Sequence, residues 1–478
     1  MNHKMIRNIL GWILLFQACF LLVPLIAAVI YRENTLLSIL ASILICLAAG
    51  LLLARKKPQN TTIYAKEGFV IVSLSWVLLS LTGALPFWFT REIPSFVDAL
   101  FETVSGFTTT GASILPEVET MSKSLLLWRS FTHWVGGMGV LVFIMAFIPL
   151  SGGQNLHIMR AESPGPSVSK LVPRIRTTAI ILYTIYLVLT LVECVLLLFG
   201  DTTVFEALNI SFSTAGTGGF GLRNDSMASF SPYTQIVVTV FMLLFSVNFS
   251  CFYLILIGRL KDAFNCEFRT FLIIVATAIT LITVNMRHAF DSLGEALRHV
   301  SFTVASLIST TGFSTENFGN WSEFSRLILI FVMFIGACAG STGGGIKVSR
   351  LVILVKGIGK ELSTMVHTKQ IKKITVDKRP VEHEVVRSVN VYMVSYLLIF
   401  AVSMTLVTLF DQMDLVSGFT AVLATFNNVG PGMNLVDAAS NYGFLSIPSK
   451  LVLTCDMLIG RLELFPVLLL FSPATWKK

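Results

Sequence analysis

Four short stretches rich in threonine, serine and glycine recur along this chain, and each lies between two long apolar runs. They are residues 105–112 (SGFTTTGA), 213–220 (STAGTGGF), 306–313 (SLISTTGF) and 424–431 (ATFNNVGP). Their side chains offer neutral hydroxyl oxygens that do not titrate, so they suit ion coordination better than acid–base catalysis. Backbone carbonyls at such non-helical turns can replace the hydration shell of a cation in a pore.

The four stretches share one register, and each ends on a glycine, which permits backbone angles that other residues resist. The anchoring glycines recur about every hundred residues, an internal repetition typical of membrane transporters. A gapless alignment places Ser105, Ser213, Ser306 and Ala424 in one column and the anchors Gly111, Gly219, Gly312 and Gly430 in another. The alternative is a set of polar re-entrant loops that only pack helices, but independent loops would not share a register.

The second stretch is the ambiguous one, because Gly216, Gly218 and Gly219 compete for the anchor position. We select Gly219, since residues 207–208 (Ala-Leu) then align with residues 99–100 (Ala-Leu) of the first stretch.

The alignment predicts an ion-coordinating filter built from three residues of each stretch. Carbonyls at membrane depth are tolerated only against protein or a water-filled cavity, so we expect these residues to line a pore. The predicted filter residues are Thr109, Thr110, Gly111, Thr217, Gly218, Gly219, Thr310, Thr311, Gly312, Asn428, Val429 and Gly430.

The composition predicts a polytopic helical membrane protein. Of 478 residues, 54% are hydrophobic and 13% charged, about half the charged fraction of average proteins. The chain is long enough for about ten spans of about 20 residues each. The net charge of +8 indicates basic cytoplasmic loops rather than nucleic-acid binding. Seven scattered cysteines show no metal-ligand spacing and no disulfide framework.

We predict an all-α membrane protein with four tandem repeats arranged with pseudo-fourfold symmetry around a central pore. Each repeat consists of a span, a short pore helix, a filter stretch and a second span, and two extra transmembrane helices (9–31 and 35–54) precede them. The predicted units are an N-terminal pair and loop (1–66), repeat 1 (67–150), a linker (151–176), repeat 2 (177–262), repeat 3 (263–354), a basic linker (355–385) and repeat 4 (386–478). The predicted pore helices cover residues 95–106, 203–213, 292–307 and 414–425.

Basic loops set the predicted orientation, because lysine and arginine gather on the cytoplasmic side of membrane proteins. The N-terminus, both linkers and Lys477–Lys478 then share the cytoplasmic face, and the filter stretches enter from the other face. The pore helices aim their C-terminal ends, with partial negative charge, at the centre. Acidic residues near that outer face would either concentrate cations or form ordinary solvated loops; they are Glu92, Asp98, Glu117, Glu119, Asp201, Glu206 and Asp225.

A glycine-rich segment interrupts the second span of repeat 3. Each glycine lowers helix propensity by about 1 kcal/mol, so this span should break within the membrane. Close helix packing on small residues is the alternative. A phosphate-binding loop is excluded, because Gly345 is followed by Ile346-Lys347 and no strand precedes the segment. The glycines are Gly336, Gly340, Gly343, Gly344 and Gly345.

Arg461 lies within the last span, where a charge usually faces a cavity or a partner. One interpretation places it beneath the filter as a positive barrier to cations, and the other pairs it with Asp456 or Glu463. His133 beside Trp134 suggests either a proton-linked step or a packed interfacial residue. Glu193 is interpreted as a hydrogen-bonding partner in helix packing.

Three further sequence motifs are informative: residues 128–139 (WRSFTHWVGGMG), 339–347 (AGSTGGGIK) and 460–466 (GRLELFP). Together with the four stretches they resemble the Trk/Ktr/HKT superfamily of potassium transporters, in particular its TrkH-type membrane subunits, from about residue 68 to about residue 470. The extra helical pair at 9–54 also resembles the TrkH and TrkG branch.

The resemblance implies potassium uptake across a bacterial inner membrane, with both termini cytoplasmic. Glycine at every anchor implies K⁺ selectivity, and the fourth stretch departs from the Thr-Thr-Gly pattern at Asn427–Val429. Residues 340–345 would form a flexible gate beneath the filter, and the two linkers would dock a cytoplasmic, nucleotide-binding TrkA-type ring. The implied K⁺ ligands are Thr110, Gly111, Gly218, Gly219, Thr311, Gly312, Val429 and Gly430, and the implied gate residues are Gly340, Gly343, Gly344, Gly345 and Arg461.

The resemblance also implies a homodimer that contacts membrane lipids, with K⁺ as the transported ligand, no cofactor in this chain and no nucleic-acid partner. Two alternatives stay open. A Na⁺-permeable cation transporter would share the layout. An intramembrane enzyme would need paired aspartates or a serine–histidine pair at depth, and the spans offer only Asp456 and His133 for those roles.

Overall fold

The structure is a computed structural model of the chain, and it describes residues 1–55, 63–139, 175–368 and 373–476. Helices dominate these residues, which confirms the predicted all-α class. Two short strands, β1 (Thr375–Val376) and β2 (Arg379–Pro380), pair antiparallel within the segment that we expected to be a linker. Several predicted regions lie outside the described residues: most of the 151–176 linker, 140–149 of the first repeat's second span, 56–62, 369–372 and 477–478.

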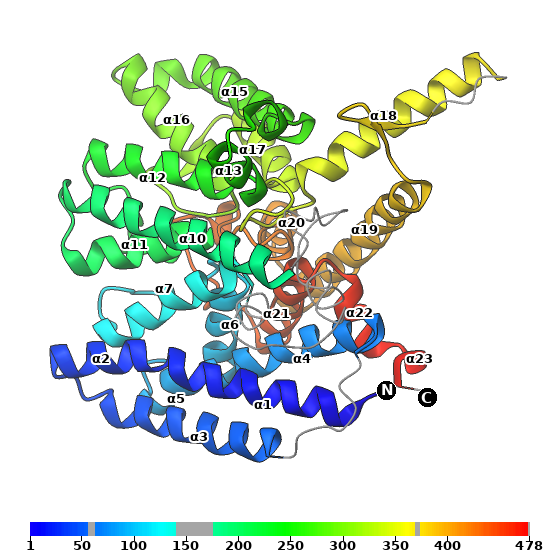
Figure 1. The fold of residues 1–478 in the computed structure, drawn as a ribbon. Coiled ribbons are helices and arrows are strands. Elements are labelled where there is room, and N and C mark those ends of the chain that lie inside the picture. Colours follow the sequence, from blue (N-terminus) through cyan, green and yellow to red (C-terminus); the bar gives the residue numbers. More distant parts are fainter. Residues whose placement is uncertain (56–62, 140–174, 369–372, 477–478) are drawn as a thin grey trace.

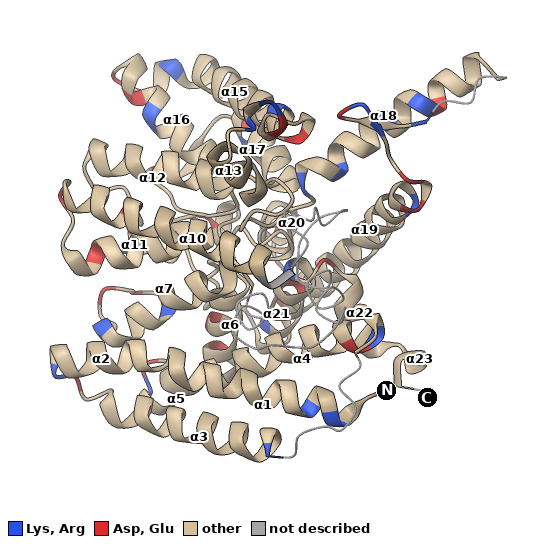
Figure 2. Ribbon diagram, in the orientation of Figure 1, with Lys and Arg blue, Asp and Glu red and all other residues tan. Residues whose placement is uncertain are grey.

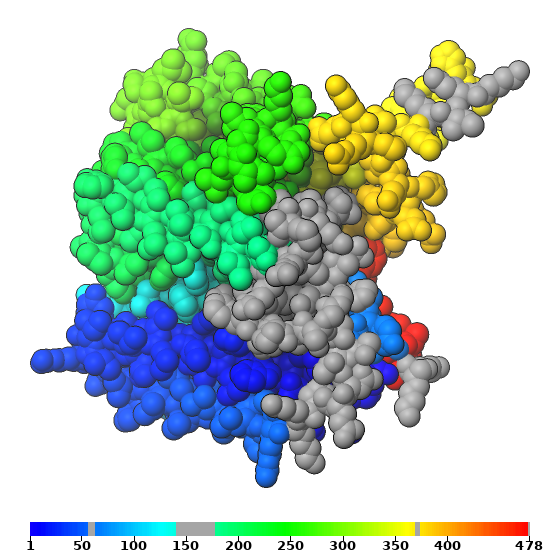
Figure 3. All heavy atoms as spheres, viewed as in Figure 1, coloured from blue at the N-terminus to red at the C-terminus, as the bar shows by residue number. Residues whose placement is uncertain are grey.

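The N-terminal helices form a layer at one edge of the molecule (blue in Figure 3). They are α1 (His3–Phe20), α2 (Leu22–Tyr31) and α3 (Leu36–Ala54). Helix α1 packs directly on α3, where a Cβ added at Gly50 would lie 3.0 Å from the Gly11 carbonyl oxygen. Such glycine contacts let two helices approach closely in a membrane. The Glu33 carboxylate, in the turn after α2, accepts the Lys123 and Ser124 amides across 2.7 and 3.1 Å and so attaches this layer to repeat 1.

Four repeats follow, each with a long first helix, a short pore helix and a second span (Figure 1). Repeat 1 contains α4 (Ala65–Gly83), α5 (Leu85–Thr90), α6 (Phe96–Phe107) and α7 (Lys123–Gly137). Repeat 2 contains α10 (Ile175–Leu198), α11 (Val204–Gly216), α12 (Pro232–Phe245), α13 (Phe249–Leu256) and α14 (Leu260–Ala263). Repeat 3 contains α15 (Cys266–Met286), α16 (Leu293–Ile308), α17 (Glu323–Ile335) and α18 (Val348–Val366). Repeat 4 contains α19 (His383–Asp411), α20 (Leu415–Phe426), α21 (Ile447–Arg461), α22 (Phe465–Phe471) and α23 (Pro473–Trp476).

The pore helices α6, α11, α16 and α20 start at equivalent N-caps. In each, the N-cap side chain accepts the backbone amide three residues later, at distances between 3.1 and 3.4 Å. This bond satisfies one of the amides left unpaired at a helix start. The sequence-based starts at 95, 203, 292 and 414 therefore fall on the caps themselves, which are Ser95, Thr203, Ser292 and Asp414.

The repeats are arranged in a ring, because each second span packs against the pore helix of the next repeat. Helix α7 contacts α11, α12 contacts α16, α17 contacts α20, and α21 returns to contact α6. The chain order 1-2-3-4 is therefore also the order around the ring. This arrangement brings the C-terminal ends of the four pore helices to the centre of the molecule.

The second spans of repeats 2 and 4 break as well, which the sequence analysis did not predict. Helices α12 and α13 meet at 91° across residues 246–248. Helix α21 ends at Arg461, and Glu463 and Leu464 then adopt φ values of 56° and 65° before α22 begins. The predicted break in repeat 3 covers residues 336–347. Among the described residues, six helices, or seven with the bent pair, pass as membrane spans by length and composition, against the ten expected. The second spans of repeats 2 to 4 are interrupted, and residues 140–149 of the second span of repeat 1 lie outside the described residues.

The predicted linker at 355–385 is also more structured than expected. Helix α18 continues to Val366 and projects beyond the body of the molecule (yellow in Figures 1 and 3). The β1–β2 hairpin follows, and α19 begins at His383.

The close contact between α1 and α3 gives a first prediction. Replacing Gly50 with leucine forces the two helices apart, at a cost of about 1–3 kcal/mol for overpacking. We expect a melting temperature several degrees lower for the detergent-purified protein, measured by intrinsic fluorescence. Leu51→Ala, on the exposed face of the same helix, should leave the melting temperature unchanged; equal effects of the two variants would contradict the packing argument.

Candidate functional site

The four filter stretches adopt one backbone conformation. In each, a residue two positions before the anchor glycine has a left-handed φ between 54° and 60°, and the anchor itself has φ between 79° and 96°. The left-handed residues are Thr109, Thr217, Thr310 and Asn428, and the anchors are Gly111, Gly219, Gly312 and Gly430. Gly219 thus occupies the position equivalent to the other anchors, whereas Gly216 and Gly218 do not.

Each pore helix ends in a Schellman motif, which accounts for the shared conformation. The amide of the residue before the anchor donates to the carbonyl five residues earlier, across 2.8–2.9 Å. The preceding left-handed residue donates to the carbonyl three residues earlier, across 2.9–3.2 Å. The acceptors of the first bond are Ser105, Ser213, Ser306 and Ala424, the column that the sequence alignment identified.

The four turns meet in a closed ring. A Cβ added at Gly111 would overlap the Gly218 carbonyl oxygen of repeat 2. The same overlap links Gly219 to Thr311 and Gly312 to Val429, and Gly430 returns to Thr110. Each anchor glycine therefore touches the carbonyl that precedes the next repeat's anchor, and no side chain fits between them. The predicted K⁺ ligands are all brought into this ring, and none of them carries a charge.

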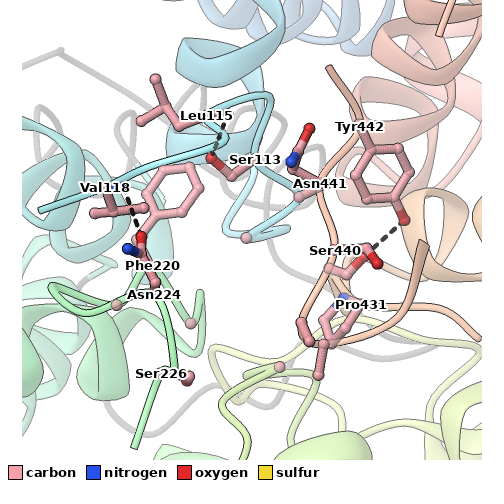
Figure 4. A pocket seen from close by; sticks show the side chains of 18 of the residues that line it. Ser113, Leu115, Val118, Phe220, Asn224, Ser226, Pro431, Ser440, Asn441 and Tyr442 are labelled. Atoms are coloured by element: carbon pink, nitrogen blue, oxygen red, sulfur yellow. Dashed lines mark hydrogen bonds between the residues drawn. The ribbon is translucent and has the colours of Figure 1, made fainter. Parts of the chain in front are cut away.

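A cavity of about 130 Å³ opens on one side of the ring and is lined by all four anchor glycines. Figure 4 shows side chains around it, among them Phe220, Pro431 and Tyr442. The Tyr442 hydroxyl donates to the Gly430 carbonyl across 2.8 Å. Asp437 also lines the cavity and accepts a bond from the Asn317 amide across 2.8 Å. Sequence reasoning missed this carboxylate, although residue 437 follows the anchor Gly430 by seven positions, much as Glu117 and Asp225 follow their anchors by six.

The acidic residues expected at the outer mouth do not line this cavity. Asp98 pairs with Lys450 across 2.6 Å and Glu206 with Arg223 across 2.8 Å. Partial burial raises the pKa of Asp201, but hydrogen bonds from Thr234 and Ser231 outweigh this and lower the pKa to about 2. These three carboxylates have structural partners, which favours the interpretation that they order the loops.

A buried ion pair lies behind the filter of repeat 1. Arg129 of α7 and Glu102 of α6 are 2.8 Å apart and almost fully buried. Glu102 also accepts the Ile114 amide across 2.9 Å and the Ser113 hydroxyl across 3.0 Å, and these residues follow the anchor Gly111. The Arg129 guanidinium lies 4.1 Å from the centre of the Phe220 ring, next to the second anchor. Sequence analysis did not predict this pair, which connects the turns of repeats 1 and 2.

His133 is buried between the same two repeats. Its Nδ1 lies 2.7 Å from the Gly106 carbonyl oxygen, and the Phe220 amide donates to its Nε2 across 3.3 Å. A carbonyl can only accept, so Nδ1 carries the proton and the ring is neutral in this geometry. Both ring nitrogens are engaged in positioning the filter, which favours the packing interpretation over a proton-linked step.

The glycine-rich segment of repeat 3 lies on the other side of the ring from the cavity. The cavity is lined by the anchors, whereas this segment contacts residues before them. Gly344 N donates to the Thr310 hydroxyl across 2.6 Å, and Gly345 N donates to the Asn427 carbonyl across 3.1 Å. A Cβ at Gly343 would lie 2.6 Å from the Ser309 carbonyl oxygen. Gly340 and Gly345 have φ values of 74° and 81°, which explains glycine at these positions.

Repeat 2 supplies the other support for this segment, through the break between α12 and α13. The Thr342 amide and hydroxyl both donate to the Phe245 carbonyl, across 3.3 and 3.1 Å. Cys338 N donates to Ser246 O across 3.0 Å, and Phe249 N donates to Gly340 O across 3.1 Å. The bend in repeat 2 thus exposes backbone groups that pair with the bend in repeat 3.

Arg461 connects the segment to the filter. Its guanidinium donates to Thr342 O across 2.7 Å and to the Thr109 hydroxyl across 3.2 Å. It also donates to the carbonyls of Gly136 and Gly137, at the end of α7, across 2.6 and 2.7 Å. Four of the predicted gate residues therefore contact the filter turns directly: Gly343, Gly344, Gly345 and Arg461. Gly340 instead contacts Asn248 in the bend of repeat 2.

The two carboxylates proposed as partners of Arg461 have other partners. Glu463 forms an ion pair with Arg350, whose guanidinium lies 4.0 Å from the centre of the Tyr392 ring. Asp456 accepts the Ser403 hydroxyl across 2.7 Å. Lys347 is a further buried cation that sequence reasoning did not place in the gate, and its ammonium donates to Gly343 O. Glu193 is fully buried in α10.

Chemically, this centre can coordinate a small cation through neutral oxygens but offers no catalytic constellation. Among the described residues, no group of three His, Cys, Asp or Glu side chains has the geometry of a metal site.

Comparisons with known proteins agree on one family. A family model described as TrkH, cation transport protein, matches residues 37–478. The chain is 34% identical to the "Trk system potassium uptake protein TrkH" of Salmonella typhimurium and of Escherichia coli K12, over 100% of each chain. It is 31% identical to the Escherichia coli "Trk system potassium uptake protein TrkG" over 99% of both chains. The crystal structure of the potassium transporter TrkH from Vibrio parahaemolyticus matches with a TM-score of 0.90 at 32% identity, over 100% of both chains.

The buried ion pair behind the filter gives a second prediction. Glu102→Gln leaves the Arg129 charge buried without its carboxylate, which typically costs about 3–5 kcal/mol. We expect a marked loss of monodisperse protein on size-exclusion chromatography and a lower melting temperature. The control is Glu117→Gln in the exposed loop after the filter, which should behave as wild type; a wild-type melting temperature for Glu102→Gln would show that the pair does not support the turn.

Proposed function

The chain belongs to the TrkH family of cation transport proteins, and we propose that it takes up potassium ions through the pore formed by its four filter turns. It is a transporter rather than an enzyme, as are the family members it matches. The observation that carries the proposal is the closed ring in which each anchor glycine touches a carbonyl of the next repeat. Relatives named as potassium uptake proteins support K⁺ as the ion.

Selection rests on backbone oxygens held at fixed positions. The carbonyls of Thr110, Gly218, Thr311 and Val429, together with those of the anchor glycines, replace water around a dehydrated K⁺. The C-terminal ends of four pore helices add partial negative charge at the same place. The departure of the fourth stretch from the Thr-Thr-Gly pattern does not disturb this arrangement, since Val429 and Gly430 keep the backbone conformation of the other three turns.

The structure corresponds to a closed state in this proposal. The segment 340–345 lies against the filter on the side away from the cavity, and Arg461 places a positive charge there. A cation that leaves the filter meets this charge before it meets bulk water. Opening requires the segment and Arg461 to move away from Thr109 and Thr310.

We assign the cavity side to the outside of a bacterial inner membrane and both termini to the cytoplasm. Figure 2 shows basic residues of α18 and of the N-terminal end of α1 on the same side of the molecule, at the right of the view. The positive-inside rule assigns this side to the cytoplasm. Ions then enter through the cavity, pass the ring and leave past the gate.

A homodimer and a cytoplasmic TrkA-type nucleotide-binding ring complete the proposal. Helix α18 projects from the body and exposes an apolar face, which supports a partner helix or lipid along its length. The exposed residues are Val355, Ile358, Leu362, Met365 and Val366. The basic residues of the same segment and of the β1–β2 hairpin are available to a regulatory ring or to anionic lipid headgroups.

Flux into sealed vesicles tests the proposal. Vesicles that contain the purified protein and are loaded with K⁺ should take up radioactive Rb⁺. Vesicles that contain the same protein but are loaded with Na⁺ should take up radioactive Na⁺ more slowly. Measurement with and without an imposed proton gradient then separates channel-like from coupled transport. Absence of cation flux above protein-free vesicles would refute the function.

The ring contact of Gly111 gives a third prediction. Serine at this position adds a Cβ that overlaps the Gly218 oxygen, at a φ of 79° that a non-glycine residue resists. The carbonyls of repeat 2 must shift, so we expect Gly111→Ser to lower the K⁺ to Na⁺ permeability ratio by about tenfold or more, the factor for about 1.4 kcal/mol of lost discrimination. Gly111→Ala separates the steric effect from the hydroxyl, and unchanged selectivity in both would place Gly111 outside the filter.

The position of Arg461 gives a fourth prediction. Arg461→Ala removes the positive charge and the bonds to Thr342, Gly136 and Gly137, so basal K⁺ flux should rise several-fold. Arg461→Lys keeps a charge but not the forked donor geometry, and we expect an intermediate flux. Arg259→Ala removes an exposed arginine that is paired with Asp262 and serves as the control. Wild-type flux in Arg461→Ala would rule out the barrier role.

A further inference from the structure

One hydroxyl of the filter accepts a hydrogen bond directly from the gate backbone. Gly344 N donates to Thr310 Oγ1 across 2.6 Å, and the next amide, Gly345 N, donates to the Asn427 carbonyl across 3.1 Å. Thr310 is fully buried, so this bond is shielded from water while the gate segment is docked. The gate segment is thus bonded to the turns of two repeats.

Thr310 differs in this respect from its three equivalents. The Thr109 hydroxyl accepts from Arg461, and the Thr217 hydroxyl donates to its own helix at Gly216 O across 2.6 Å. Asn428 donates to the Thr110 hydroxyl and to Met457 O, both across 2.9 Å. Of the four left-handed filter residues, all of which the structure describes, Thr310 is the one whose side chain forms a hydrogen bond with the backbone of the gate segment.

This bond affects the ring of carbonyls because Thr310 directly precedes a residue that contributes a carbonyl to the ring. Thr310 holds a φ of 60°, which a β-branched residue adopts at a cost. The next residue, Thr311, supplies the carbonyl that touches Gly219. When the gate segment is docked, it stabilises the turn that presents this carbonyl; when it leaves, the turn loses a buried hydrogen bond.

We infer that Thr310 is a positioning residue that couples the gate to the filter, so that K⁺ in the ring stabilises the docked gate. The inference rests on the proposed conduction of K⁺. Coupling between two equilibria is reciprocal: if docking favours the ring that holds K⁺, then K⁺ favours docking by the same factor. Removal of K⁺ from the filter therefore weakens the docking of the gate segment.

Hydrogen exchange of the full-length protein in detergent tests the coupling, with mass spectrometry of peptides covering residues 336–347. In the wild type, exchange of these amides should be slower in K⁺ than in choline, by about fivefold for a coupling of about 1 kcal/mol. Thr310→Val keeps the β-branched shape and loses the hydroxyl, so the K⁺ dependence should disappear. Thr310→Ser retains the hydroxyl and should restore it. If the valine variant is not monodisperse, Thr310→Ala replaces it.

The outcomes separate this inference from the proposed function. If the wild type carries K⁺ in vesicles but its gate peptides exchange equally in K⁺ and choline, the coupling is wrong and conduction stands. Persistence of the K⁺ dependence in Thr310→Val or Thr310→Ala would also overturn the role of Thr310. Absence of K⁺ flux in the wild type would overturn both.

Discussion

The structure depends on four close approaches between backbone atoms, each of which only glycine permits. Each anchor glycine lies so near a carbonyl oxygen of the next repeat that an added Cβ would overlap that oxygen. These glycines are Gly111, Gly219, Gly312 and Gly430. Positive φ at each of these positions adds a second reason for glycine. A ring made in this way is narrow, neutral and lined by peptide oxygens. These properties are the ones that dehydration of a monovalent cation requires.

The rest of the fold holds this ring in place. Four capped pore helices end in the same Schellman turn, and each second span supports the pore helix of its neighbour. Two buried polar groups, the Glu102–Arg129 pair and His133, connect the turns of repeats 1 and 2. On the gate side, the breaks in the second spans free backbone amides and carbonyls, and these bond one another and the filter. In the proposed function, selection and closure thus use the same chemistry at adjacent levels of the pore.

Much of the ring could be predicted from the sequence, because its geometry depends on local turn chemistry. The register of the four stretches, the anchor Gly219 and the N-caps of the pore helices follow from residue types and spacing. The break in repeat 2 could not be predicted in this way. Residues 246–248 contain no glycine or proline, and their bend is supported by bonds to a segment almost a hundred residues away. The Glu102–Arg129 pair, Asp437 and the partners of Arg461 are likewise tertiary, since each joins residues that only the closed ring brings together.

The central claim is that a monovalent cation binds within the ring of carbonyls, and anomalous diffraction from crystals grown with Tl⁺ or Rb⁺ tests it most directly. The account predicts anomalous peaks on the central axis between the carbonyls of Thr110, Gly218, Thr311 and Val429. Replacement of the heavy cation by Na⁺ should remove the peaks. Peaks confined to Asp437 or to other surface carboxylates, with an empty axis, would contradict it.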